Sequence, residues 1–231
     1  MDQRTDAEGF ILAGGRSTRM GQDKALLQVG GRSLVELALE KLRGLGGPTP
    51  RIAAARVDLS SYAPVIPDLH PGCGPLSGIE AALAASSRPL NLFLPVDIPL
   101  MPGRFLLWML RRAEITGALV TVPRINGRPQ PLCAVYHRDL LRGITASLLA
   151  GNHKVMPAVT TAASEQAIDQ AIEQAIDQAI DQAIDVFDVE QVASTSEQLH
   201  GFTSLPLYRW FHNCNTPEDM AGIENALVLS Q

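Results

Sequence analysis

The sequence predicts a single α/β domain built on a mainly parallel (mixed) sheet, and three observations support this prediction. Apolar runs of strand length alternate along the chain with segments of helical periodicity. One run, residues 90–102, is apolar almost without a break and ends in an acid and prolines, as expected for a strand buried on both faces. With 231 residues, 46% of them hydrophobic and 19% charged, the chain suits one large domain with a sizeable core.

The expected elements follow in order from the N-terminus. Residues 10–13 predict a first short strand. Residues 30–47 predict a helix, because Ser33 and Glu36 have the spacing of a capping box and a glycine-rich stretch follows the apolar face. Further strands are expected at residues 51–55, 90–102 and 118–124, further helices at 79–87 and 105–115, and a strand leading into a helix at 131–141.

Composition and charge narrow the class of protein. The formal net charge is −5, but residues 165–185 carry six acids and no base, so the rest of the chain is close to neutral. We therefore expect no nucleic-acid surface, which needs a concentrated basic stripe, and no membrane span, which needs a long uncharged apolar run. The polar N-terminus and three widely spaced cysteines without a CxxC pattern favour a reducing cytoplasm over a disulfide framework or zinc cluster.

The repeat of the tetrad AIDQ interrupts the α/β pattern. We interpret residues 160–185 as a low-complexity acidic insertion in a domain formed by residues 1–159 and 186–231. A four-residue step turns each repeated Ile by about 40° from the last, which gives no fixed core stripe. The two interpretations left open are a solvated, marginal helix or flexible insertion, and a helix that binds a partner.

A glycine-rich segment after the first strand carries the clearest functional signal. Gly14 and Gly15 let the backbone turn tightly and approach a ligand, and exposed backbone N–H groups suit phosphate oxygens. Arg19 and Lys24 add positive charge for a polyphosphate. The spacing matches neither a P-loop nor a dinucleotide fingerprint. On this segment alone, a strand-to-helix turn with solvated cations stays an alternative.

Five motifs lie in order along the chain, namely residues 12–24, GPLSG at 74–78, PVDIP at 95–99, RPQPL at 128–132 and NCNTPED at 213–219. The first resembles the signature loop of nucleotidyltransferases that activate sugars and cofactors. With the four later motifs the chain is similar to the molybdenum cofactor guanylyltransferase family, over nearly its whole length apart from the repeat. The resemblance implies a Rossmann-like three-layer fold of nucleotidyltransferase type.

The activity implied by this resemblance is the transfer of GMP from GTP to molybdopterin, with release of pyrophosphate. The product would be the guanine dinucleotide form of the molybdenum cofactor. Such a reaction depends on positioning and charge neutralisation, and the attacking phosphate is already ionised, so no general base is required. The implied cofactor is Mg²⁺. The implied partners are GTP, molybdopterin or Mo-molybdopterin, and transiently the cofactor-synthesis proteins and apo-molybdoenzymes.

The resemblance also assigns roles to individual residues. Lys24, Asp97 and Arg19 are the expected catalytic residues. Asp97 is also the expected Mg²⁺ ligand at a strand end, although an acid there also serves as a simple strand terminator. Asp68 is expected to contact the guanine base, with an exposed loop acid as the alternative. The expected nucleotide-binding residues are Leu12, Ala13, Gly14, Gly15, Lys24, Asp68, Gly74 and Asp97.

Two amides are expected on the molybdopterin side, namely Asn213 and Asn215. The residues that follow predict a helix start as well, with Thr216 as N-cap and Pro217 in the first turn. Both interpretations are compatible, because capping is local. Gln130 lies at a position matched by the family, but its role is not assigned.

One departure from the family pattern keeps other functions open. Where the family often has an Asn-x-Asn-Arg run after its second strand, this chain has AAAR at residues 53–56. The alternatives are therefore transfer of CMP to the same pterin or of a nucleotide to a sugar phosphate. A further alternative is a carrier without catalysis that delivers the cofactor through its acidic repeat.

Overall fold

The computed structural model describes residues 6–14, 23–53, 58–171, 176–195 and 205–229. In these ranges, no helix combines the length and the apolar character that a bilayer crossing requires. The three cysteines all fall within them and are free thiols.

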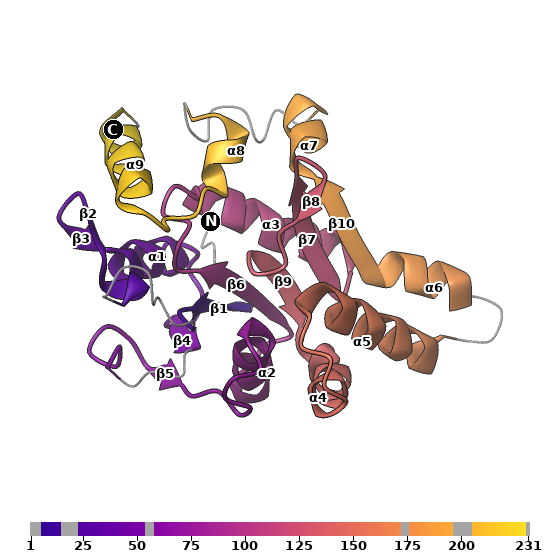
Figure 1. The fold of residues 1–231 in the computed structure, drawn as a ribbon. Helices are drawn as coiled ribbons and strands as arrows, with labels where there is room; N and C mark the ends of the chain where they lie inside the picture. Colours follow the sequence, from indigo (N-terminus) through magenta and orange to yellow (C-terminus); the bar gives the residue numbers. More distant parts are fainter. Residues whose placement is uncertain (1–5, 15–22, 54–57, 172–175, 196–204, 230–231) are drawn as a thin grey trace.

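A mixed eight-stranded sheet forms the centre of the molecule (Figure 1). Its strands are β1 (Ala7–Leu12), β4 (Arg51–Ala53), β5 (Val65–Ile66), β6 (Leu90–Pro95), β7 (Val120–Ile125), β8 (Arg128–Pro129), β9 (Ala134–His137) and β10 (Ile184–Asp188). The order is β10-β7-β9-β6-β1-β4-β5, and β8 pairs with β7 at the side. Among the described strands of this sheet, β8 and β9 run opposite to the other six. The predicted α/β class with a mainly parallel sheet is confirmed.

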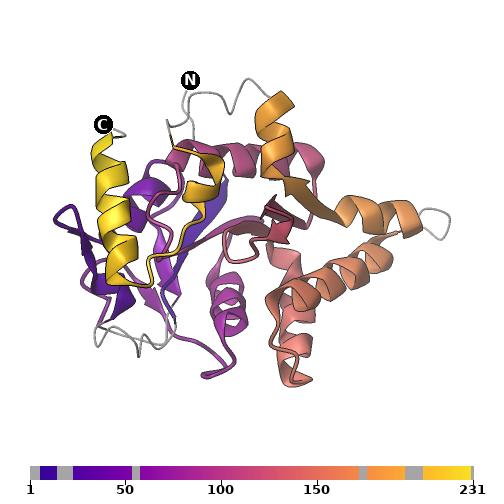
Figure 2. The same ribbon diagram turned by 45° about the horizontal axis from the view of Figure 1, so that its top comes forward.

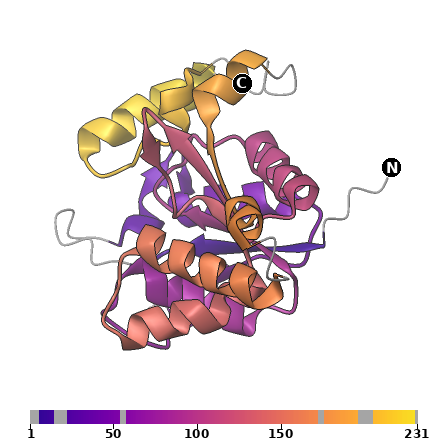
Figure 3. The same ribbon diagram turned by 90° about the vertical axis from the view of Figure 1, so that its right-hand side faces the viewer.

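Helices cover both faces of this sheet, which gives three layers. The buried residues of α1 and α3 belong to one core, and those of α2, α4 and α5 to the other. Figure 3 shows α3 on one side of the sheet and α4 with α5 on the other. The helices are α1 (Leu34–Arg43), α2 (Pro75–Ala85), α3 (Gly103–Thr116), α4 (Leu141–Leu149), α5 (Val155–Gln170), α6 (Ile176–Ala183), α7 (Val189–Thr195), α8 (Leu207–Trp210) and α9 (Pro217–Leu229), with 3₁₀ turns η1 (Lys24–Leu26) and η2 (Arg138–Leu140).

The alternation of side chains along β1 explains the two cores. Successive residues of a strand point to opposite faces, so Phe10 and Leu12 enter one core while Ile11 enters the other. Phe10 stacks on Phe93 of the neighbouring β6 with ring centroids 5.5 Å apart. Because both faces are covered, these strands are apolar throughout, which is the pattern that predicted them.

Two predicted helices show how local sequence sets their ends. At α1 the predicted capping box is confirmed, because Ser33 Oγ accepts from Glu36 N while Glu36 Oε2 accepts from Ser33 N. The helix expected at 79–87 begins earlier, at Pro75. Proline suits the first helical position, since its fixed φ matches the helix and its missing N–H removes no bond. The GPLSG motif therefore forms the first turn of α2.

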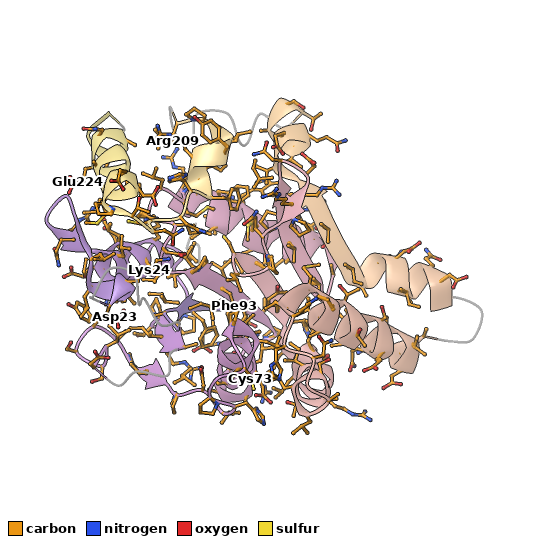
Figure 4. All side chains as sticks on the ribbon, viewed as in Figure 1. Asp23, Lys24, Cys73, Phe93, Arg209 and Glu224 are labelled. Atoms are coloured by element: carbon orange, nitrogen blue, oxygen red, sulfur yellow. The ribbon has the colours of Figure 1, made fainter. Side chains whose placement is uncertain are left out.

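The C-terminal segment returns to the core shared by α1 and α3. Trp210 and Ile223 are fully buried there. A small separate hairpin, β2 (Gln28–Val29) with β3 (Arg32–Ser33), lies beside α9 (Figures 1 and 2). Glu224 on α9 accepts from the backbone N of Gly30 at 3.2 Å, across this contact (Figure 4). The helix start predicted at Pro217 is confirmed.

Regular elements run across both ends of the segment interpreted as an insertion. The buried face of α5 passes through Ala162 and Ala163 and continues into the repeat at Ala167. The last tetrad ends in β10, where Asp185 forms a two-pronged ion pair with Arg112 at 2.6 and 2.8 Å. The boundaries at 160 and 185 remain a prediction. The expected absence of a core stripe is contradicted among the described residues, because Ile180 and Ile184 are partly buried and pack against the core, whereas Ile168 is exposed.

Candidate active site

The carboxyl ends of three central strands meet at one edge of the sheet. Val96 N donates to Leu12 O at 3.1 Å, and Ala13 N donates to Ala53 O at 3.2 Å. These bonds hold the segments after β1, β4 and β6 side by side. Ligands of open α/β sheets bind at this edge, beyond the carboxyl ends of the strands.

Three predicted site residues contact one another here. Lys24 Nζ donates to Asp97 Oδ2 at 2.7 Å and also to the amide oxygen of Asn215. The side chains of Lys24 and Asp97 are 25% and 20% exposed, so the pair is accessible. The three residues come from η1, from the end of β6 and from the segment before α9. The structure thus brings together residues that are up to 191 positions apart in the sequence.

Local structure explains the position of Lys24. Asp23 caps η1, because its Oδ1 accepts from Ala25 N at 2.9 Å. Lys24 is therefore the first residue of a capped turn rather than part of an extended loop. Figure 4 shows Asp23 and Lys24 on this turn, below α9. The sequence pattern identified Lys24, whereas the cap that orients it was not predicted.

The predicted base-contacting residue lies in a small cluster beside the strand ends. A methyl group built on Gly78 would lie 3.5 Å from Asp68 Oδ1, 3.6 Å from Leu12 Cδ2 and 3.8 Å from Ala53 Cβ. Asp68, Leu12 and Ala53 thus surround the first turn of α2. Burial raises the pKa of Asp68, since desolvation disfavours its charged form. A carboxylate in this setting suits a ligand with N–H donors.

Gly74 provides the entry to α2. Its φ of +74° lies in the region that glycine adopts readily and other residues rarely do. No side chain caps α2 at this position. The positive end of the helix dipole is therefore open to an anionic ligand at the same edge as Asp97.

The loop that leads into α2 is held by a buried carboxylate, Glu80, which was not predicted from the sequence. Glu80 on α2 is 1% exposed, and its two oxygens lie 2.7 Å from His70 Nδ1 and 2.7 Å from Thr145 Oγ1. His70 is further fixed because its backbone N donates to Ser77 Oγ at 3.0 Å. The available signal was a lone acid in the otherwise apolar and small-residue run IEAALAA.

A pocket of about 600 Å³ opens on the other side of Asn215. A two-residue turn, Asn126 and Gly127 with φ of 50° and 71°, projects the β7–β8 hairpin towards it. The Asn-Gly dipeptide was the signal that could have predicted this hairpin. The lining residues are Ile125, Asn126, Arg128, Gln130, Tyr208, Phe211, His212, Asn213, Asn215 and Asp219. The pocket thus contains both predicted amides and Gln130.

The remaining predicted residues divide into two groups. Leu12, Ala13 and Gly14 lie at the carboxyl end of β1, and Gly74 directly precedes α2. Gly15, Arg19 and the residues at 54–56 lie outside the described residues, so their roles stay predictions. A larger hollow of about 1040 Å³, between α1 and α3, contains none of the predicted site residues.

Comparisons with known proteins agree with this arrangement. A probable molybdenum cofactor guanylyltransferase from Pelotomaculum thermopropionicum is 39% identical over 153 residues, covering 65% of this chain and 73% of the relative. The molybdenum cofactor guanylyltransferase of Vibrio cholerae is 33% identical over 158 residues, covering 67% and 77%.

Solved structures share the fold. The molybdopterin-guanine dinucleotide biosynthesis protein A of Archaeoglobus fulgidus superposes with a TM-score of 0.70 at 22% identity, covering 96% of this chain and 98% of that one. The 2-C-methyl-D-erythritol 4-phosphate cytidylyltransferase of Thermus thermophilus gives 0.56 at 18%, covering 94% and 97%. The model of the MobA-like NTP transferase domain matches residues 9–166, which include the glycine segment, the Asp68 loop and Asp97. With more than half of its length matched, this chain belongs to the MobA-like NTP transferase family.

Proposed function

We propose that this protein transfers GMP from GTP to molybdopterin and releases pyrophosphate. The observation that carries the proposal is the contact of Lys24 with both Asp97 and Asn215. This contact lies between a cluster suited to a nucleotide and a separate pocket suited to an acceptor. The names of the relatives, molybdenum cofactor guanylyltransferases, support the choice of substrates.

In this reaction an oxygen of the acceptor's terminal phosphate forms a bond to the α-phosphorus of GTP. The bond from that phosphorus to the bridging oxygen breaks, and the electron pair leaves with pyrophosphate. The backbone at Leu12–Gly14 and the open end of α2 would hold the nucleotide, with Asp68 facing its base. The Lys24 ammonium would neutralise charge on the triphosphate. Positioning and charge neutralisation are the main contributions a protein makes to phosphoryl chemistry of this kind.

Mg²⁺ dependence belongs to the same proposal. Among the described residues no group of three or more His, Cys, Asp or Glu side chains gathers to hold a metal ion. A single carboxylate at the site nevertheless fits Mg²⁺, which commonly takes one or two protein carboxylates and completes its shell with phosphates and water. Asp97 is the residue that would hold it. When bound, the ion supplies positive charge to the triphosphate.

The pocket beyond Asn215 is the proposed acceptor site. Asn213 and Asn215 supply amide groups, and Arg128 supplies a guanidinium for an anionic group. Tyr208 is 55% exposed and offers an aromatic surface for a flat heterocycle. Transient contacts with cofactor-synthesis proteins and apo-molybdoenzymes follow from the same proposal, because the substrate is made and the product used elsewhere. A reducing cytoplasm suits three free thiols.

A second candidate, transfer of CMP to the same pterin, is favoured by one observation. Ala53 is buried beside Asp68 and Gly78, where its methyl group offers no hydrogen bond to a base. Selection of guanine would then depend on Asp68 and the backbone alone.

The test is Mg²⁺-dependent pyrophosphate release with molybdopterin, comparing GTP, CTP, ATP and UTP in parallel. We expect release with GTP, no release without Mg²⁺, and release about a thousandfold slower from Asp97→Asn. Release with CTP alone would replace the proposal by the second candidate. Tight nucleotide binding with no release from any of the four would favour a carrier without catalysis.

A further inference from the structure

The segment that carries Asn213 and Asn215 is tied together by one carboxylate. Asp219 Oδ2 accepts from the backbone N of Asn215 and of Thr216, each at 2.9 Å. Asp219 Oδ1 lies 3.1 Å from His212 Nε2. In return, Asp219 N donates to Thr216 Oγ1 at 3.1 Å, which completes a capping box at the start of α9.

Two further contacts link this segment to Asp97 and Lys24. Cys214 N donates to the backbone oxygen of Asp97 at 2.7 Å. The Asn215 amide oxygen accepts from Lys24 Nζ. A single segment, residues 212–219, therefore contacts Asp97 and Lys24 and also lines the acceptor pocket.

The charge of Asp219 is satisfied within the chain. Its backbone bond from Asn215, followed by those from His212 and Thr216, holds the pKa of this carboxyl below its usual range. A carboxylate whose oxygens accept from its own chain is well suited to hold a loop and poorly suited to bind a ligand. Asp219 thus differs from its neighbour Glu218, which is exposed and lies in the same first turn of α9.

We propose that Asp219, although it lines the acceptor pocket, is a positioning residue for the acceptor half of the reaction, because its carboxylate is taken up by its own chain and fixes Asn215 against Lys24. The inference rests on the proposed function. It assigns Asp219 to acceptor binding and orientation, and leaves nucleotide binding to the Asp68 side of the site.

The kinetic test compares three single variants with the wild-type protein. Asp219→Ala should raise KM for molybdopterin about tenfold and lower kcat, while KM for the nucleotide stays within twofold. Asp219→Asn should stay within threefold of wild type, because its amide oxygen can replace Oδ2 as the acceptor for both backbone N–H groups. Glu218→Ala removes a negative charge from the same helix turn and should behave as wild type. A tenfold loss in Asp219→Asn would overturn the proposal in favour of direct contact with the substrate.

A double variant tests whether Asp219 acts through Asn215. If it does, Asp219→Ala combined with Asn215→Ala should be no worse than Asn215→Ala alone. Multiplying losses would show that Asp219 has an independent role and would contradict the proposal.

A readout without substrate separates this inference from the proposed function. Hydrogen exchange at the Cys214 amide reports the bond to the Asp97 carbonyl. It should become at least tenfold faster in Asp219→Ala and stay unchanged in Glu218→Ala. Unchanged exchange in Asp219→Ala would overturn the positioning role. Absence of turnover in the wild-type protein, with exchange as expected, would refute only the proposed function.

Discussion

Two ion pairs of similar length lie at opposite ends of the central strands. At the amino end of β1, Arg51 Nε donates to Glu8 Oε1 at 2.6 Å. At the carboxyl end, Lys24 Nζ donates to Asp97 Oδ2 at 2.7 Å. The sheet contacts both pairs, and the cation and carboxylate in each come from different segments of the chain.

Further contacts surround the Glu8–Arg51 pair and close it to ligands. Glu8 Oε2 accepts from Ser86 Oγ at 3.0 Å, Arg51 Nη2 donates to Ala85 O at 3.0 Å, and the Arg51 guanidinium lies 5.1 Å from the Phe10 ring centroid. Glu8 is only 7% exposed in its side chain. These groups leave little room for a ligand, so the pair holds β1, β4 and α2 together.

The second pair is open and joins segments that are not paired strands. Its residues sit on a 3₁₀ turn and just beyond a strand end, and the third partner, Asn215, leads to a pocket. A salt bridge is thus weak evidence of function by itself. Its place relative to the strand ends, its exposure and its third partner distinguish the two roles.

The largest expected effect concerns the open pair. Asp97→Asn keeps the shape of the side chain but removes its charge, so turnover should fall about a thousandfold, as for loss of a key electrostatic group. The melting temperature should stay within a few degrees of wild type, because Asp97 is partly exposed. Pyrophosphate release and thermal unfolding measure the two effects. Turnover above one tenth of wild type would contradict the assignment of Asp97 as a catalytic residue.

Loss of the Glu8–Arg51 pair should lower stability and leave turnover unchanged. Glu8→Ala leaves Arg51 half-buried without its carboxylate, which should lower the free energy of unfolding by about 3 kcal/mol. Turnover per folded molecule should be unchanged, because the pair lies at the far end of the sheet. Denaturant unfolding together with active-site titration tests this. A loss of turnover in fully folded Glu8→Ala would show that the two ends are coupled.

A smaller change at the open pair separates charge from shape. Lys24→Met keeps most of the side-chain length and should lower turnover about thirtyfold, by removing the cation that faces the triphosphate. The nucleotide dissociation constant should rise as well, measured by calorimetry. If only molybdopterin binding weakened, Lys24 would serve the acceptor rather than the triphosphate.

The smallest effect concerns a lysine that has carbonyl partners instead of a carboxylate. Lys41 Nζ donates to Pro99 O at 2.7 Å, and burial lowers its pKa to about 8. In the unfolded chain it titrates near 10.4, so the cost of burying the charged form is fully present below pH 8 and is relieved as the pH rises from 8 towards 10.4. The stability of wild type relative to Lys41→Gln should therefore rise by about 2 kcal/mol between pH 8 and pH 10. Chemical unfolding at both pH values measures it, and a fall in this range would contradict the sign.

The sequence predicted the parts of the site that depend on local patterns. The apolar run that ends at Asp97, the glycine segment near Lys24 and the helix start at Pro217 are each visible in a few adjacent residues. The roles of Asp219 and Glu80 were not visible, because they depend on partners brought together by folding. Glu80 meets His70 and Thr145 only after α2 packs on α4.

The same distinction applies to the fold. Alternating strands and helices predicted the sheet, but β10 was missed because its first residues belong to the acidic repeat. The alanines of the repeat are small enough to pack closely, which the spacing of the isoleucines alone does not reveal. The Asn-Gly dipeptide before Arg128 is a sequence signal for a hairpin turn. Pairing of β8 with β7 follows from that turn.

The way the repeat is anchored bears on how this gene can change over generations. Ala167 is buried on α5 and Ala183 on α6, and Asp185 forms an ion pair with Arg112. Between these positions the chain repeats tetrads of the form Ala-Ile-Asp/Glu-Gln, of which Ala179 and Ile180 also pack against the core. Repetitive coding sequence gains and loses units readily during replication. Closely related genomes should therefore differ in tetrad number here, with the strand register of β10 and the catalytic edge unaltered.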